Sequence, residues 1–129
     1  MGNEPKNKTV LVIDDSTTNV VLLQAILLKK GYEIQTALSV KEAYAIIAKK
    51  IPDLILLDLL MPRINGYDFL KEIKSNNTMQ NIPVVVVSAL TDQENIKKTI
   101  EFGAHSFVKK PIEIQNLVEL VDSILFPIN

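Results

Sequence analysis

Four consecutive apolar residues, Leu54 to Leu57, stand in the middle of the chain with a helix-like segment on either side. A continuous apolar run of this length is typical of a central strand in a parallel sheet that helices cover on both faces. The run ends at Asp58, and the turn signals Met61-Pro62 and Asn65-Gly66 follow it. A carboxylate at this position is costly to bury unless a cation or hydrogen-bond donors meet it. An isolated aspartate here would be interpreted as a turn residue, so the interpretation of Asp58 depends on the rest of the chain.

Strand-like and helix-like segments alternate along the whole chain. The segments expected to form strands are 9–13, 33–37, 54–57, 84–87 and 106–108. Each is followed by a segment with the spacing of apolar residues that is typical of a helix. This alternation predicts an α/β fold, in which a five-stranded, doubly wound parallel sheet carries helices on both faces. We expect a polar tail over 1–8, one domain over 9–126, and a chain end or the start of a linker over 127–129.

Composition excludes several classes of protein. A chain of 129 residues with a net charge of −1 is an ordinary single domain and gives no reason to expect nucleic acid as a direct partner. The absence of cysteine excludes a disulfide framework and a thiolate metal site. No apolar run reaches the length of a membrane span, and the N-terminus lacks a secretory signal. We therefore expect a cytoplasmic protein without a membrane partner.

Polar side chains follow four of the five predicted strands at their carboxyl ends. They are Asp14 and Asp15, Asp58, Ser88, and Lys110. In folds of this type these strand ends meet at one edge of the sheet, where ligands bind. Three neighbouring carboxylates repel one another unless a divalent cation lies among them, and Mg²⁺ needs few carboxylates because it keeps several waters. Each residue alone has an ordinary structural explanation, but together they favour one shared site for Mg²⁺ and a tetrahedral oxyanion such as a phosphoryl group.

The motifs around these residues resemble the receiver domain of two-component response regulators from about Lys8 to Leu125. The matching motifs are Ile13-Asp14-Asp15-Ser16, Asp58-Leu59-Leu60-Met61-Pro62 with Asn65-Gly66, Ser88-Ala89, Gly103-Ala104 and Phe107-Val108-Lys109-Lys110-Pro111. The resemblance implies a flavodoxin-like sheet with strand order 2-1-3-4-5, as in the chemotaxis receiver that exemplifies this order.

The resemblance also implies a function in phosphorelay signal transduction. Asp58 would take a phosphoryl group from the phosphohistidine of a sensor histidine kinase or a histidine phosphotransfer protein, and Lys110 and Ser88 would bind the phosphoryl oxygens. Such a protein catalyses its own phosphorylation and dephosphorylation but is a signalling module rather than an enzyme. Mg²⁺, for which Mn²⁺ would substitute, is expected on the ligands Asp14, Asp15, Asp58 and the backbone carbonyl of Leu60.

Two residues correspond to the switch of this family, Ser88 and Phe107. Their movement on phosphorylation would change the face formed by the fourth helix, the fifth strand and the fifth helix. This chain has Phe107 where the best-known members of the family have tyrosine. No side-chain hydroxyl is therefore available to form a hydrogen bond that differs between the inward and outward positions of the ring. Pro111 is expected to follow a cis peptide bond, as the family's proline does. An effector domain or a second copy of the chain would be further partners, and the resemblance leaves both open.

Three other functions would require the same fold or some of the same residues. A phosphatase of the haloacid dehalogenase type requires a second aspartate two residues after the first, where this chain has Leu60. A flavodoxin-like flavin binder needs a phosphate-binding loop after the first strand, where Asp14 and Asp15 would repel the phosphate. A degenerate receiver that serves only as a scaffold stays open as an alternative, although every required residue is present.

The predicted helix after the first strand has more apolar residues than one buried side requires. They are Val20, Val21, Leu22, Leu23, Ile26, Leu27 and Leu28. We expect the surplus, with Val20 at its outer end, to dock the helices of the phosphodonor. His105 and the lysines in 71–74 and 97–98 are expected to lie on solvated surface.

The lifetime of the phosphoryl group is expected to be long. Two positions flank this group in the family, and here they are Leu60 and Leu90. Neither leucine can hold the water that hydrolysis needs opposite the Asp58 oxygen, although bound Mg²⁺ and Lys110 would still stabilise the transition state. Combining Leu60→Asn with Leu90→Glu should accelerate decay about tenfold if about 1.4 kcal/mol of barrier is involved. A decay rate that stays the same or falls, measured by loss of phosphoryl mass over time, would contradict this role of the leucines.

Overall fold

The computed structural model describes residues 6–61, 64–89 and 92–128. Its main sheet consists of the strands β1 (Thr9–Ile13), β2 (Glu33–Ala37), β3 (Leu54–Leu57), β6 (Val84–Ser88) and β7 (Ser106–Lys109). The strands are parallel and lie in the order β2-β1-β3-β6-β7. Among these five strands this is the order 2-1-3-4-5, so the predicted fold class is confirmed.

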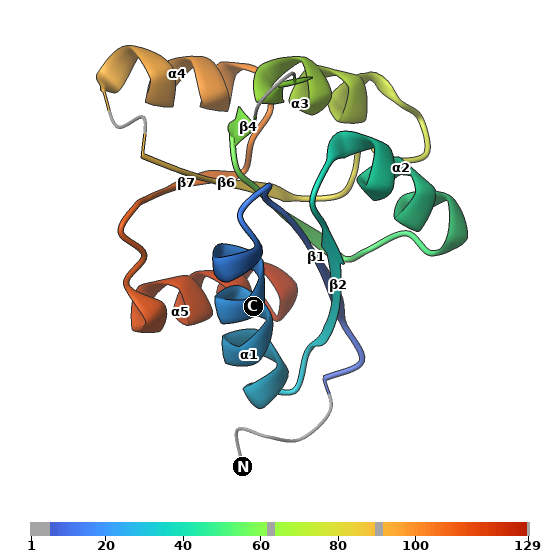
Figure 1. The fold of residues 1–129 in the computed structure, drawn as a ribbon, viewed down its shortest axis with the longest axis vertical. Coiled ribbons are helices and arrows are strands. Elements are labelled where there is room, and N and C mark those ends of the chain that lie inside the picture. Colours follow the sequence, from blue (N-terminus) through green and yellow to red (C-terminus); the bar gives the residue numbers. More distant parts are fainter. Residues whose placement is uncertain (1–5, 62–63, 90–91, 129) are drawn as a thin grey trace.

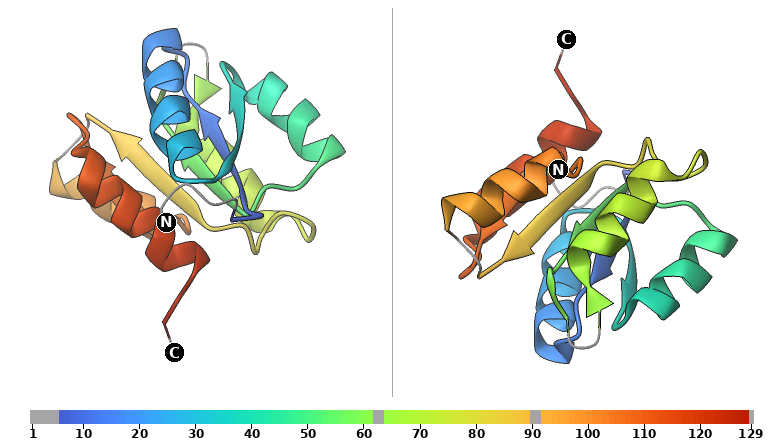
Figure 2. Two further views of the ribbon diagram at one scale, coloured as in Figure 1. Left: turned by 90° about the horizontal axis from the view of Figure 1, so that it is seen from below. Right: turned by 90° about the horizontal axis from the view of Figure 1, so that it is seen from above.

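Helices cover both faces of the sheet (Figure 1, Figure 2). The helices on one face are α1 (Thr17–Lys29) and α5 (Ile114–Leu125), and those on the other are α2 (Val40–Lys49), α3 (Gly66–Ser75) and α4 (Gln93–Glu101). Successive side chains of β1, β3 and β6 alternate between two buried clusters, one under each helical layer. Burial on both faces explains why these strands are continuous apolar runs. Within the described residues, no helix has the length and apolar character needed to cross a membrane.

Helix boundaries follow the local chemistry of the chain. Ser16, Ser39 and Asp92 precede α1, α2 and α4, and each side chain accepts a hydrogen bond from the backbone N–H three residues later. Gly31 and Gly103, which follow α1 and α4, have φ angles of 96° and 104°. A residue with a Cβ rarely adopts this left-handed conformation, so glycine lets the chain turn back toward the next strand.

The segment after Asp58 contains a small element that the sequence did not indicate. The strands β4 (Leu60–Met61) and β5 (Ile64–Asn65) form an antiparallel ladder between β3 and α3. A strand of two residues is too short to show a periodic pattern, and the turn signals here predicted only a loop.

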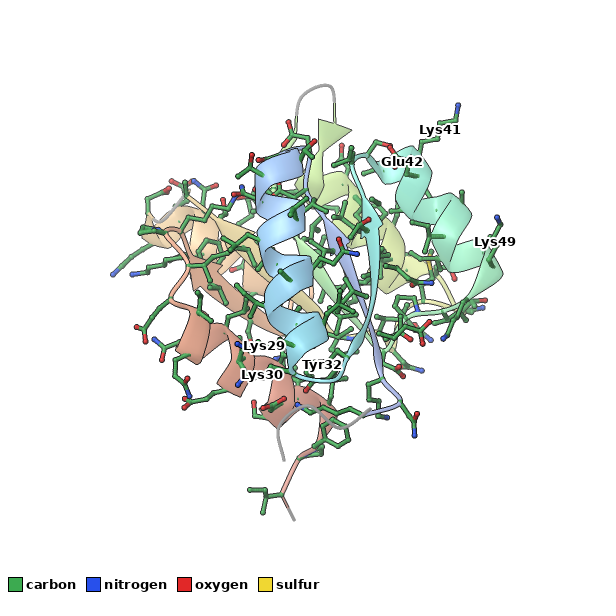
Figure 3. All side chains as sticks on the ribbon, turned by 60° about the horizontal axis from the view of Figure 1, so that its bottom comes forward. Lys29, Lys30, Tyr32, Lys41, Glu42 and Lys49 are labelled. Atoms are coloured by element: carbon green, nitrogen blue, oxygen red, sulfur yellow. The ribbon has the colours of Figure 1, made fainter. Side chains whose placement is uncertain are left out.

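Residues 6–8, expected to belong to a polar tail, are attached to the domain. The Lys8 carbonyl accepts a hydrogen bond from the Glu33 N–H, which extends the pairing of β1 with β2. The Lys6 ammonium lies 3.2 Å from the Asp122 carboxylate and 4.4 Å from the centre of the Tyr32 ring. Figure 3 shows Tyr32 beyond the end of α1, where its hydroxyl donates to Asp122. Burial is the largest cause that raises the pKa of Tyr32, and the hydrogen bond to Asp122 raises it further.

Lys74 is partly buried, although the helical pattern predicted that it would be solvated. Its Nζ donates to the carbonyls of Gln80 at 3.2 Å and Ile82 at 2.6 Å, and burial lowers the pKa of Lys74. Its stem packs against Gly103, where an added Cβ would lie 2.7 Å from the Lys74 Cγ. Lys74 therefore joins the end of α3 to the segments that precede β6 and β7.

Candidate functional site

Two buried carboxylates lie at the carboxyl edge of the sheet. Backbone hydrogen bonds from the Asp14 N–H to the Ala37 carbonyl (3.1 Å) and from the Asp58 N–H to the Ile13 carbonyl (3.0 Å) continue the ladders beyond the strands. These bonds fix the backbone positions of Asp14 and Asp58, from which the two carboxylates extend. Asp14 is 3% exposed and Asp58 is 5% exposed, whereas Asp15 is exposed. One carboxylate oxygen from each of the three lies within 4.8 Å of the others.

Lys110 contacts two of these carboxylates. Its Nζ lies 3.4 Å from the Asp14 Oδ2 and 3.4 Å from the Asp58 Oδ2. Its backbone N–H donates to the Ser88 carbonyl at 3.0 Å, and the peptide bond to Pro111 is cis, as the resemblance implied. Three carboxylates against one ammonium leave an excess of negative charge, and all three offer oxygen ligands. The aspartate cluster could therefore hold a hard divalent cation.

The last residue of β6 brings a hydroxyl to the same edge. Ser88 is fully buried and pairs in register with Lys109 of β7. Phe107, two residues earlier on β7, is partly buried and packs against the cluster beneath α2 and α3. The sheet thus carries Ser88 and Phe107 on adjacent strands, as the order of strands predicted.

Two residues that orient Asp14 were missed in the sequence. The Ser16 N–H donates to the Asp14 Oδ1 at 2.9 Å, and the Asn19 Nδ2 donates to the Asp14 Oδ2 at 3.3 Å. A signal for both was present, since a serine before an apolar helix is an N-cap and residue 19 lies one turn later. The first turn of α1 therefore holds the carboxylate that Lys110 also contacts.

Some predicted positions fall outside this description or differ from it. Leu90 and the side chain of Leu60 lie outside the described residues, so their effect on phosphoryl lifetime stays a prediction. Val20 is buried, with only 5% of its surface exposed. The prediction that it lies at the outer end of a docking face is therefore wrong. The large apolar residues exposed on α1 are instead Val21, Leu22 and Leu28.

The chain matches a known protein family over most of its length. The family described as the response regulator receiver domain matches residues 10–122. The chain belongs to this family. Receiver domains are signalling modules, and phosphorylation by a sensor kinase is their general function.

Curated relatives contain such a receiver domain within longer chains. The response regulator PleD of Caulobacter vibrioides is 39% identical over 104 residues, which cover 81% of this chain and 23% of PleD. The phosphate regulon transcriptional regulatory protein PhoB of Pseudomonas aeruginosa is 30% identical over 118 residues, which cover 92% of this chain and 52% of PhoB. The chain therefore spans about a quarter to a half of these relatives.

Solved receiver structures share the fold over nearly their whole length. A putative response regulator from Chloroflexus aurantiacus is 34% identical, with a TM-score of 0.86, and the match covers 95% of this chain and 98% of the other. The chemotaxis protein CheY4 of Vibrio cholerae is 27% identical, with a TM-score of 0.85, over 92% of this chain and 98% of the other.

Proposed function

We propose that this receiver domain accepts a phosphoryl group on Asp58 from a phosphohistidine of a sensor histidine kinase or a histidine phosphotransfer protein. The observation that carries the proposal is the convergence of three carboxylates and the Lys110 Nζ at one edge of the sheet. Asp58 directly follows β3, the central strand of this sheet, so groups from the strands on either side lie around it.

The transfer step starts from a carboxylate that the Lys110 ammonium already contacts. An oxygen of Asp58 forms a bond to phosphorus while the bond from phosphorus to the histidine nitrogen breaks, and its electron pair returns to the imidazole. The Lys110 ammonium, now divided between Asp14 and Asp58, would bind a phosphoryl oxygen as a point charge. The Ser88 hydroxyl would donate to another oxygen.

Asp58 is a better acceptor than Ser88. A serine needs a neighbouring base to become a nucleophile, whereas a carboxylate is already ionised. The chain has one histidine, His105, which is exposed at the start of β7 and lies 2.6 Å from the Ser106 hydroxyl. His105 is therefore not placed to activate Ser88.

Asp14, Asp15, Asp58 and the backbone carbonyl of Leu60 would hold Mg²⁺, and Mn²⁺ would substitute. When bound, Mg²⁺ would neutralise charge on the transferring phosphoryl oxygens. The first turn of α1 holds Asp14 for this role through Ser16 and Asn19, whereas Asp15 is exposed to solvent.

The output of phosphorylation would come from Ser88 and Phe107. Movement of Ser88 toward the phosphoryl group would let Phe107 rotate inward and change the surface of α4, β7 and α5. In the cytoplasm this surface would contact an effector domain or a second copy of the chain. We place the boundaries of the receiver unit at residues 9 and 126.

The proposal is tested by incubating the chain with Mg²⁺ and acetyl phosphate and measuring its intact mass. The expected result is the addition of one phosphoryl group, and no addition when EDTA is present from the start of the incubation. A chain that gains no mass under these conditions would be a scaffold without phosphoacceptor activity, and the proposal would be wrong.

The exposed side of α1 leads to a prediction about the phosphodonor. Val21 and Leu28 are 56% and 51% exposed and lie seven residues apart on one side of the helix, which begins beside Asp14. Val21→Glu should slow transfer from a phosphorylated kinase about tenfold if about 1.4 kcal/mol of docking energy is lost. Labelling by acetyl phosphate should not change.

The matched control for this variant is Ile51→Glu, which places the same charge at an exposed apolar residue between α2 and β3. Ile51→Glu should leave both reactions unchanged. If Val21→Glu slows acetyl phosphate as much as it slows the kinase, the substitution has damaged the site and α1 is not the docking face.

A further inference from the structure

The start of α3 is packed directly against the backbone that follows Asp58. Leu59 is the next residue and is buried, and Gly66 is the first residue of α3. A Cβ added to Gly66 would lie 2.8 Å from the Leu59 Cα and 3.0 Å from the Leu59 carbonyl oxygen. This contact leaves no space between the two backbones. A shift of the chain at residues 58–59 would therefore move the start of α3 as well.

The next residue, Tyr67, extends from α3 to α4. Its hydroxyl donates to the Asn95 Oδ1 at 2.5 Å. Its ring meets the Phe102 ring edge to face, with centroids 5.7 Å apart, and the Lys98 Nζ lies 4.5 Å from the centre of the Tyr67 ring. The two helices lie side by side on the same face of the sheet (Figure 1). One side chain of α3 thus contacts both the first and the last turn of α4.

Asn95 connects this contact to the beginning of α4. Its Nδ2 donates to the Asp92 Oδ1 at 2.6 Å, and its backbone N–H donates to the Asp92 Oδ2. Because the amide nitrogen is turned toward Asp92, the N-cap of α4, the amide oxygen is left to accept the Tyr67 hydroxyl. A movement of Tyr67 therefore acts on the residues that start α4.

Within the described residues, α4 buries little of its surface. Thr99 is its single buried residue, and Ile100 is exposed. A helix that buries so little apolar surface can shift or loosen at small cost in free energy. Its position is then sensitive to the hydrogen bond and the ring contact that Tyr67 supplies.

We propose that Tyr67 is a positioning residue that transmits the phosphorylation state of Asp58 to α4 through the contacts of Leu59 with Gly66 and of Tyr67 with Asn95. This route rests on the proposed phosphorylation of Asp58. It differs from the Ser88 and Phe107 switch because it runs through α3 rather than β6 and β7. It gives α4 two connections to the phosphorylation site, one from each side.

The test compares amide hydrogen exchange of residues 93–101 in the wild type, Tyr67→Phe and Tyr44→Phe, each with Mg²⁺ and with or without acetyl phosphate. Tyr67→Phe keeps the ring and removes only the hydroxyl. Tyr44→Phe is the matched control, because the Tyr44 hydroxyl also bridges two helices, donating from α2 to Glu72 of α3. Intact mass reports the extent of phosphorylation of every sample.

In the wild type and in Tyr44→Phe, acetyl phosphate should change the exchange of α4. In Tyr67→Phe, α4 should exchange roughly fivefold faster without acetyl phosphate, as expected for one lost hydrogen bond. Phosphorylation should change that rate clearly less than in the wild type, because only the connection through Ser88 and Phe107 is intact. The mass increment should equal that of the wild type. A purely structural role would raise exchange equally in both states and preserve the difference between them.

A phosphorylation-dependent change of α4 that is the same in Tyr67→Phe as in the wild type would overturn the inference while leaving Asp58 as the acceptor. Absence of phosphorylation in the wild type would instead contradict the proposed function. The mass measurement separates these two outcomes within one experiment.

Discussion

Asp58→Asn is expected to abolish phosphorylation by acetyl phosphate while preserving the fold. The amide has nearly the shape of the carboxylate but lacks its nucleophilic charge, so no bond to phosphorus forms. The substitution also removes one of three neighbouring negative charges, and Lys110 keeps its contact with Asp14. The melting temperature without metal should therefore stay the same or rise. Intact mass after incubation with Mg²⁺ and the phosphodonor measures the first effect, and thermal unfolding measures the second.

The matched control is Asp68→Asn, which makes the same chemical change at an exposed carboxylate in the first turn of α3. Asp68→Asn should show the full mass increment of the wild type. An increment that persists unchanged in Asp58→Asn would show that another residue is the acceptor.

Asp15→Ala is expected to remove the response of the chain to Mg²⁺. Binding of the ion to the folded state should stabilise the wild type by about 2.7 kcal/mol when the metal is at about 100 times its Kd. Because Asp15 is exposed, its truncation leaves no buried cavity and mainly removes a ligand and a repulsive charge. Without metal, the melting temperature of the variant should equal or exceed that of the wild type. With metal, it should lie well below the melting temperature of the metal-bound wild type. Thermal unfolding at several Mg²⁺ concentrations measures this difference.

Glu101→Ala provides the control for Asp15→Ala, because it removes an exposed carboxylate at the end of α4. Its melting temperature should rise with Mg²⁺ as that of the wild type does. If calorimetry finds the same metal response in Asp15→Ala, the ion binds at another place on the chain.

Much of this site was predictable because it depends on where strands end. The apolar runs that precede Asp14, Asp58 and Ser88 are buried on both faces, so each run and its first polar residue are visible in the sequence. Parallel strands then bring these ends to one edge without further information. Lys110 directly follows strand β7, so the order of strands brings it to the same edge.

The residues that were misplaced or missed depend on contacts between elements. In α1, apolar residues occur nearly all around the helix, so periodicity does not show that Val20, Leu23 and Leu27 face inward while Val21 faces solvent. Lys74 looked solvated because its carbonyl partners, Gln80 and Ile82, lie in a loop whose path no local pattern gives.

The hydrogen bond between Tyr67 and Asn95 is of the same kind. It joins two residues on different helices that are 28 positions apart in sequence, and its acceptor is oriented by a third residue, Asp92. Propensity and periodicity describe single elements, so a contact of this kind appears only when the elements are packed together.

The central claim is that the phosphoryl group resides on Asp58 itself. Borohydride reduces the acyl carbon of an acyl phosphate to an alcohol and leaves free carboxylates intact, so it marks the phosphorylated residue permanently. After incubation with Mg²⁺ and acetyl phosphate, reduction and peptide mass mapping should find homoserine at position 58, and none when either reagent is omitted. Conversion of Asp14 or Asp15 instead, or a borohydride-resistant phosphoryl group on Ser88, would contradict the account.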